Sequence, residues 1–427
     1  MSIASAMSTA VSGLKSEAQA LSTVANNLAN SSTIGYKANS TRFISLVTTS
    51  YTDNVPSSGA GVTAVSRQNV AAQGGVSATS SSTDMAIDGN GFFVVSRKSS
   101  SAGTSTPTNP LYTRDGEFSV DDKGYLSLGN DYYLEGYTYS YNTSTGANVA
   151  TGSVGALRVQ DGKEKWKPTA NLSLDANLPM SVWTKAKTTG VPSSITTSTT
   201  IYDTIGTSHT VTMTFTTDAS ASDQWDVSLT SSEASLSFST SYYTMLFNPT
   251  NGALSQVNGG AVTAPITVSS NLVTSTGTLP LTFDFTDLTQ YDSGSTFKLT
   301  SLSQDGYPPS SYSGVTVSSD GVVTSTYGSG LTITVGQVAL YNFANVNGLT
   351  VLSDGMYQES TTSGKALAGV SGDNGTGTIK SQALEASTTD TGTEFTKMIV
   401  AQQAYSAASQ VISTSKTMFS DLVSAVR

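Results

Sequence analysis

The chain has 427 residues, of which 37% are hydrophobic and 12% are charged, and its formal net charge is −10. This length predicts about two to four domains, and the acidic balance argues against a nucleic-acid-binding protein. The absence of Cys excludes disulfides, thiolate metal sites and Cys nucleophiles, and a single His, His209, argues against a multi-His metal site.

The first predicted element is a helix over residues 1–30. Small and apolar residues recur there at alternating spacings of three and four, which is the heptad pattern of a helix that packs against other helices. The pattern stops at Asn30-Ser31-Ser32-Thr33, and Gly35 follows, which predicts the end of the helix and a turn. The stripe consists of Ala4, Met7, Val11, Leu14, Ala18, Leu21, Ala25 and Leu28.

From about residue 40 to residue 385 the pattern changes to short β-runs separated by Gly, Asn and Asp. Such closely spaced strands and turns predict β-sandwiches or barrels. The interval from about 185 to 280, rich in Ser and Thr and poor in charge, is interpreted as an inserted outward domain. Residues 360–382, with five Gly, are interpreted as an extended connector to the last helix.

The last predicted element is a helix that reaches the end of the sequence or nearly so. Residues at steps of seven form its apolar stripe, and Asp390, Thr393 and Glu394 suit a helix start. The stripe comprises Met398, Tyr405, Ile412, Phe419 and Val426, with Phe395, Ile399, Ala401, Ala408, Val411, Leu422 and Val423 beside them.

These elements predict a mainly β fold with terminal α-helices. The two heptad helices are expected to pair in an inner domain, with two outer β-sandwich or barrel-like domains nested between them as insertions. The expected division is 1–30 with 385–427 for the helical domain, 31–70 with 361–384 for an extended connector, 71–145 with 291–360 for the first β-domain, and 146–290 for the inserted outer β-domain.

Neither helical stripe has adjacent sequence that could cover it. One reading pairs the two helices within one molecule, and the other packs them against copies from further subunits. The small residues in both stripes and the scarcity of charge on the outer helix faces favour the second reading, because a solvated helix face normally carries charges.

The sequence contains only partial matches to known catalytic and metal-binding motifs. Asp88-Gly89-Asn90-Gly91 resembles part of a calcium loop but lacks the closing Glu, so a tight hairpin turn is preferred. His209 follows Ser208 without a supporting Asp or a nucleophile-elbow motif, and it is interpreted as structural or exposed. No catalytic, cofactor-binding or metal site is predicted, and a carboxylate-based hydrolase would need acids that converge in a deep cleft.

Four blocks of the sequence resemble the bacterial flagellar rod and hook family. They are residues 25–37 (ANNLANSSTIGYK), 83–93 (TDMAIDGNGFF), 112–118 (YTRDGEF) with 124–126, and 394–405 (EFTKMIVAQQAY). Gln403, Ala408 and residues 387–391 depart from the usual family pattern. The signature residues carried over are Asn26, Asn27, Asn30, Thr33, Gly35, Tyr36, Lys37, Asp88, Gly89, Gly91, Phe92, Arg114, Asp115 and Gly116.

Three further blocks, 202–209, 304–307 and 336–343, resemble the outer domains of the hook-forming members of that family. The resemblance implies a non-enzymatic homopolymer, a hollow and bendable helical tube that transmits motor torque to the filament. It also implies contacts with the distal rod, the hook cap, the hook–filament junction proteins and the flagellar type III export apparatus.

The implied location is extracellular, on the hook attached to the basal body, after export without a cleaved signal peptide. No cofactor and no nucleic acid are expected. Membrane insertion is not expected either, since no apolar run reaches about 18 residues. A distal rod subunit and a secreted β-rich adhesin remain as alternatives.

Overall fold

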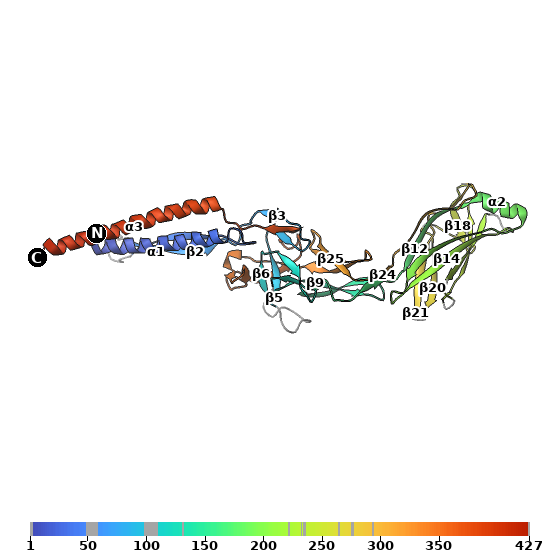
Figure 1. Ribbon diagram of the computed structural model, residues 1–427, viewed down its shortest axis with the longest axis horizontal. Helices are drawn as coiled ribbons and strands as arrows, with labels where there is room; N and C mark the ends of the chain where they lie inside the picture. Colours follow the sequence, from blue (N-terminus) through green and yellow to red (C-terminus); the bar gives the residue numbers. More distant parts are fainter. Residues whose placement is uncertain are drawn as a thin grey trace.

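The computed structural model describes residues 3–47, 59–97, 110–129, 132–220, 223–231, 233, 236–263, 265–274, 277–292 and 294–425. The molecule is elongated, and three parts follow one another along its length (Figure 1). We call them the helical unit, which carries both chain termini, the middle unit and the outer unit. The predicted fold class, mainly β with paired terminal helices, is confirmed.

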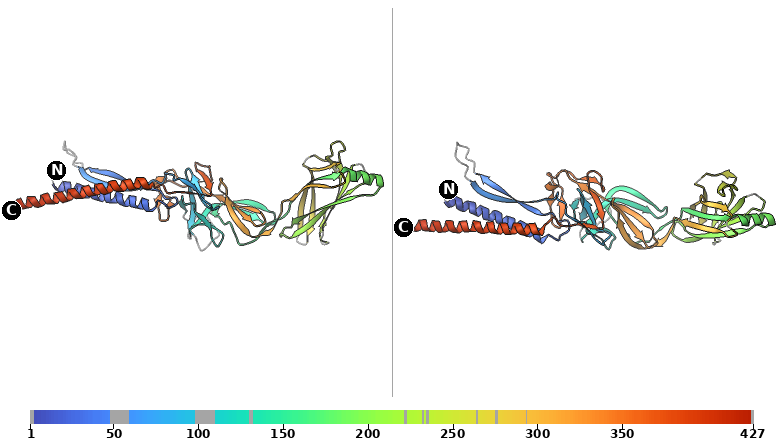
Figure 2. Two further views of the ribbon diagram at one scale, coloured as in Figure 1. Left: turned by 45° about the horizontal axis from the view of Figure 1, so that its top comes forward. Right: turned by 90° about the horizontal axis from the view of Figure 1, so that it is seen from above.

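The helical unit contains α1 (Ile3–Ala29) and α3 (Thr391–Ala425), which run antiparallel side by side (Figure 2). A hairpin of β1 (Asn39–Val47) and β2 (Gly59–Gln68) lies along α1. The predicted connector over 31–70 therefore contains a hairpin that packs on the helix. With 35 residues against 27, α3 is longer than α1 by about 12 Å at 1.5 Å per residue, and its end projects beyond the start of α1 (Figure 1).

The middle unit is built around one strongly curved sheet of 13 strands. Alternate side chains of a strand face opposite sides of the sheet, so Phe93 and Val95 enter one hydrophobic cluster while Phe92 and Val94 enter another. The strands are β5 (Phe92–Arg97), β6 (Leu111–Thr113), β7 (Phe118–Val120), β8 (Leu126–Leu128), β9 (Tyr132–Asn142), β10 (Ala147–Ala156), β25 (Tyr312–Val317), β26 (Val322–Tyr327), β27 (Thr332–Val338), β28 (Leu340–Asn342), β29 (Thr350–Val351), β30 (Met356–Gln358) and β31 (Leu367–Gly369), with a short 3₁₀ helix at Val346–Gly348.

Two small antiparallel pairs join the C-terminal part of the chain to the start of the middle unit. They are β3 (Val76–Ala78) with β33 (Ala383–Glu385), and β4 (Met85–Asp88) with β32 (Thr378–Ser381). The predicted hairpin at 88–91 is wrong, because β4 pairs with β32 while β5 pairs with β6, β9 and β28. The segment is instead a turn between two sheets, in which Gly89 and Gly91 have φ of 112° and 119°.

The outer unit is a sandwich of two six-stranded sheets, and the short helix α2 (Met180–Thr189) lies at its far end (Figure 1). One sheet contains β12 (Asn171–Pro179), β16 (Ser237–Phe238), β20 (Thr267–Thr274), β21 (Gly277–Asp284), β22 (Leu288–Tyr291) and β23 (Lys298–Gln304). The other contains β13 (Ser194–Tyr202), β14 (Ser208–Thr217), β15 (Gln224–Ser231), β17 (Tyr242–Phe247), β18 (Leu254–Val257) and β19 (Gly260–Ala261).

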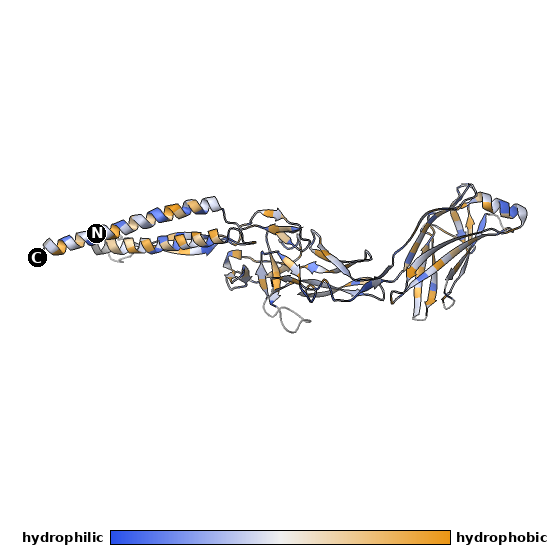
Figure 3. Cartoon of the chain, viewed as in Figure 1, coloured by the Kyte–Doolittle hydropathy of each residue, from blue (hydrophilic) through white to orange (hydrophobic). Residues whose placement is uncertain are grey.

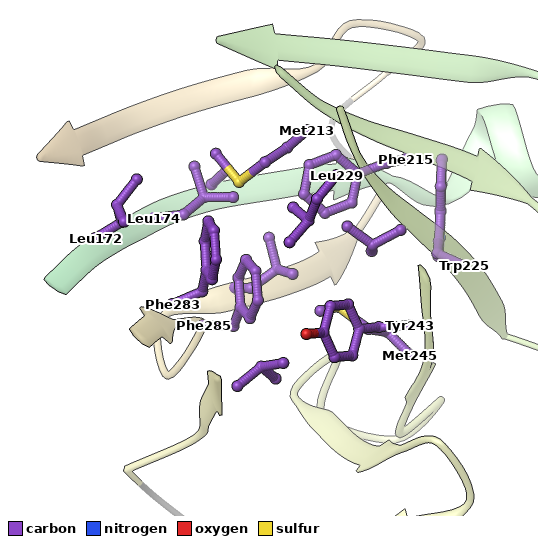
Figure 4. Close-up of a cluster of buried hydrophobic side chains, with 14 of the residues drawn as sticks. Leu172, Leu174, Met213, Phe215, Trp225, Leu229, Tyr243, Met245, Phe283 and Phe285 are labelled. Atoms are coloured by element: carbon purple, nitrogen blue, oxygen red, sulfur yellow. The ribbon is translucent and has the colours of Figure 1, made fainter. Parts of the chain in front are cut away.

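Alternation of apolar and hydroxyl side chains explains this sandwich. Val211, Met213 and Phe215 are fully buried, while the Thr residues between them are only partly buried. Side chains from both sheets meet in one core (Figure 4). The outer domain was predicted over 146–290, whereas strand pairing gives the sandwich limits of 171 and 304. The first limit is later because β10 pairs with β9 in the middle sheet, and the second is later because β23 pairs with β12.

A two-stranded ribbon, β11 (Lys165–Lys167) with β24 (Tyr307–Ser310), connects the middle and outer units. The Lys167 Nζ atom lies 3.3 Å from the Asp305 Oδ2 atom, and both side chains are more than a quarter exposed. This ion pair at the joint is therefore accessible to solvent.

A buried carboxyl in the middle unit predicts a pH-dependent stability. Glu135 is 3% exposed, and its Oε2 atom has no hydrogen-bond partner among the described residues. Burial raises the pKa of this carboxyl above its ordinary 4.5. Just above that value the folded state holds a proton that the unfolded state has lost, so the free energy of unfolding falls as the pH rises toward the folded-state pKa.

We expect Glu135→Gln to remove this loss and to raise the melting temperature at pH 7 more than at pH 4.5. Thermal denaturation followed by circular dichroism at both pH values measures the difference. Glu117→Gln is the matched control, because the Glu117 side chain is exposed in the loop before β7. A Glu135→Gln protein with the same pH profile as the parent would contradict the expectation.

Candidate assembly surface and joint

The predicted stripe of α1 is not the side that is most deeply buried within the molecule: four of its seven described side chains are exposed and three are half-buried. The opposite side of the helix is the buried one: the Ser16 Oγ atom donates to the Val62 carbonyl of the hairpin at 3.1 Å, and Asn27 contacts α3. Ala10, Ala20, Thr23 and Val24 complete this buried side. In the predicted stripe, Met7, Val11, Ala18 and Ala25 are exposed and Leu14, Leu21 and Leu28 are half-buried, while the side chain of Ala4 is outside the described part.

The α3 helix packs on α1 through only two residues of the predicted stripe, Ala401 and Ala408, together with Glu394 and Ser415. Glu394, Ala401 and Ser415 are buried, and Ala408 is half-buried. These four residues are seven apart, and the three small ones allow close approach of the two helices. In the predicted stripe, Met398 and Ile412 are half-buried and Phe395, Tyr405, Phe419 and Leu422 are exposed, while Val426 is outside the described residues.

The paired helices therefore expose many apolar side chains to solvent, and hydrophobic residues recur along both helices (Figure 3). Large exposed apolar patches are rare on soluble monomers and are typical of interaction surfaces. None of the described helices combines the length and hydropathy that a membrane span requires. We call the exposed set the helical surface: Met7, Val11, Phe395, Ile399, Val400, Tyr405, Val411, Met418, Phe419, Leu422 and Val423, exposed by 37–59%.

A buried ionic cluster lies where the helical unit meets the middle unit. The Glu385 carboxylate accepts hydrogen bonds from the Lys37 ammonium, from the Gly74 N–H at 2.8 Å and from the Arg114 Nη1 atom at 3.1 Å. The Gly35 N–H donates to the Glu385 carbonyl at 2.8 Å. The Lys37 and Glu385 side chains are 0% exposed and Arg114 is 6% exposed. Segments far apart in the sequence thus meet at one carboxylate.

The Asn27 side chain forms a second polar contact between helices and hairpin. Its Nδ2 atom donates to the Asn39 carbonyl at 2.8 Å and to the Glu394 Oε2 atom at 3.1 Å. Its Oδ1 atom accepts from the Asn39 N–H at 2.8 Å and from the Tyr36 hydroxyl at 3.2 Å. All donor and acceptor positions of this amide are used, so it fixes α1, β1 and α3 relative to one another.

Half of the predicted signature residues lie at this joint: Asn27, Gly35, Tyr36, Lys37, Gly89, Phe92 and Arg114. The Arg114 guanidinium donates to the Gly89 carbonyl at 2.8 Å and lies 5.2 Å from the centre of the Phe92 ring. Gly35 has a φ of 66°, and a Cβ there would lie 2.9 Å from the Arg114 carbonyl carbon, so this contact requires glycine.

Other signature residues support the chain locally. The Asn30 Nδ2 atom donates to the Asn26 carbonyl at 2.9 Å, and the Thr33 hydroxyl donates to Asn30. Asp115 accepts the Glu117 N–H at 3.0 Å. Asp88 is apart from the cluster, exposed on the surface near Lys380.

Sequence reasoning missed the two acids on which this joint depends. Glu385 received no role, and Glu394 was assigned only to the start of the helix. Both come from the C-terminal segment, and their partners across the joint, Asn27 for Glu394 and Arg114 for Glu385, are more than 260 residues away along the chain. Ala383 and Glu385 are both buried in β33, but a strand of three residues shows no period from which this burial could be read in the sequence.

His209, expected to be structural or exposed, is buried. Its Nδ1 atom lies 3.1 Å from the Glu233 Oε1 atom, and its Nε2 atom lies 3.3 Å from the Asp203 Oδ2 atom. Carboxylates therefore occupy both ring nitrogens, which leaves neither to activate a hydroxyl nucleophile. In the described part of the chain no cluster of His, Asp and Glu has the arrangement of a metal site.

Four family models match consecutive parts of the chain. They are "Flagella basal body rod protein" over residues 7–37, "Flagellar hook protein FlgE/F/G D1 domain" over 86–167, "Flagellar basal body protein FlaE D2 domain" over 171–307 and "Flagellar basal body rod FlgEFG protein C-terminal" over 380–425. The matched ranges lie mainly in the helical, middle, outer and again the helical unit, in that order.

Similar proteins match over the full length. The flagellar hook protein FlgE of Brucella suis biovar 1 is 34% identical over 100% of both chains, and FlgE of Escherichia coli K12 is 29% identical over 98% of this chain and 99% of its own. The crystal structure of Helicobacter pylori flagellar hook protein FlgE2 aligns with a TM-score of 0.47 at 13% identity, covering 73% of this chain and 100% of that one.

Proposed function

Since this chain belongs to the flagellar hook protein FlgE family, and is a structural subunit of the bacterial flagellar hook, we propose that its copies pack through the helical surface into a hollow tube. The observation that carries this proposal is the exposure of apolar side chains along both helices of a single molecule. Contacts between copies that do not close on themselves produce an open helical polymer.

The three units have separate places in the proposed tube. The helical unit forms the inner wall, because it alone carries the long apolar surface that needs partners. The middle and outer units stack outward from it, in keeping with the elongated shape in Figure 1. In this arrangement the tube transmits torque from the motor to the filament through many subunit contacts.

Electron microscopy of the concentrated, purified chain tests this function. We expect tubes from the full chain and only separate particles from a version limited to residues 31–390, which lacks both helices and keeps the ionic cluster. Tubes from the shortened version would contradict the assignment of assembly to the helices.

We further propose that the polymer contacts the distal rod, the cap and the junction proteins at its ends, and that the subunit leaves the cell through the flagellar type III apparatus. Membership in the family supports these partners. Antibody labelling of isolated flagella should mark only the short curved segment between rod and filament. Label along the filament or confined to the rod would contradict the placement.

A further inference from the structure

The ionic cluster joins three parts of the chain through one side chain. Glu385 lies in β33, Lys37 precedes the β1–β2 hairpin, and Arg114 follows β6. The Lys37 ammonium also donates to the Ala72 carbonyl at 2.6 Å, and Arg114 also donates to the Ile87 carbonyl at 3.4 Å. Each cation thus donates both to the carboxylate and to a main-chain carbonyl, which for Lys37 lies just before β3 and for Arg114 lies in β4.

Glu385 is the carboxylate that both buried cations of the cluster contact. One buried carboxylate faces two buried cations, and the Arg114 Nε atom has no hydrogen-bond partner among the described residues. Burial lowers the pKa of both Lys37 and Arg114, and the Glu385 charge opposes this effect. Removing one partner of a buried ion pair strongly destabilises the folded state, because the charge left behind is uncompensated.

We propose that Glu385 is a positioning residue whose carboxylate holds the helical unit in one orientation on the middle unit. The chain segments from α1 and into α3 both pass this carboxylate, through Lys37 and through Glu385 itself. Tilting the helical unit away from the middle unit would separate Lys37 from Glu385 inside a site that water does not reach.

The joint between the middle and outer units provides an internal comparison. Its ion pair, Lys167 with Asp305, is more than a quarter exposed on both sides, and such pairs restrain geometry weakly. A change at Glu385 is therefore expected to loosen only the inner joint.

Distances between spin labels test the proposal on the whole chain in its monomeric form. The chain contains no Cys, so pairs of labelled cysteines can be introduced at exposed serines: Ser409 on α3, Ser119 on β7 and Ser198 on β13. The 119–409 pair spans the inner joint and the 119–198 pair spans the outer joint. We expect Glu385→Gln to widen the 119–409 distance distribution about twofold and to leave the 119–198 distribution unchanged.

Lys380→Gln is the matched control, because it removes an exposed ion pair with Asp88 on the adjacent strand, and it should change neither distribution. Should Glu385→Gln fail to fold, the double variant Lys37→Gln, Glu385→Gln removes the excess cation and should still widen the 119–409 distribution. An unchanged 119–409 distribution in the folded variant, equal widening of both pairs, or a parent distribution that is already broad would each overturn the proposal.

Discussion

Replacing Val11 with aspartate is expected to abolish tube formation while the single subunit keeps its fold. Val11 is 39% exposed on the outward side of α1, so the charge remains hydrated in the monomer. In the proposed tube the same carboxylate would be buried without a partner, at a cost of about 3–5 kcal/mol for each subunit. Sedimentation and electron microscopy measure the polymer, and thermal denaturation measures the fold.

Val191→Asp is the matched control for this substitution. Val191 follows α2 in the outer unit and is 63% exposed, so the chemical change is identical and only its location differs. Normal tubes are expected from this control. Normal tubes from Val11→Asp would contradict the assignment of the α1 stripe to subunit packing.

Replacing Gly116 with alanine is expected to destabilise the middle unit by about 3 kcal/mol. A Cβ at this position would lie 1.6 Å from the Met85 carbonyl oxygen, and the Met85 N–H donates to the Gly116 carbonyl at 3.0 Å. The backbone must therefore move, and the contact between this loop and β4 is lost. Denaturant unfolding followed by circular dichroism measures the change.

Gly75→Ala provides the comparison, because no atom lies within 4 Å of a Cβ built there. Its unfolding midpoint should stay close to that of the parent. If both glycine variants unfold at the same midpoint, the close approach at Gly116 does not contribute to stability.

The helical elements were predictable because their signal is local. The heptad spacing located α1 and α3 within a few residues of their observed ends at Ala29 and Thr391. The spacing did not reveal which side of α1 packs within the molecule. Ala10, Ser16 and Ala20 are as small as many residues on the exposed side, and only the hairpin and α3 determine that they are buried.

The joint between the helical and middle units could be predicted only in part, because its hydrogen bonds and ion pairs connect segments that are far apart in the sequence. The family resemblance singled out Lys37 and Arg114 as signature residues, but neither composition nor spacing predicted which residue either of them would contact. Glu385 belongs to a three-residue strand, which is too short to show a period. The hairpin expected at 88–91 failed for the same reason, since the partner of β4 is β32, nearly 300 residues later.

The helical surface is the centre of this account, and the most direct measurement of it is an electron cryomicroscopy reconstruction of the assembled tube. We predict that Val11, Ile399 and Phe419, which are 39%, 55% and 57% exposed in the single molecule, become buried against neighbouring copies. A reconstruction in which these side chains face solvent, with subunits joined only through their middle and outer units, would contradict it.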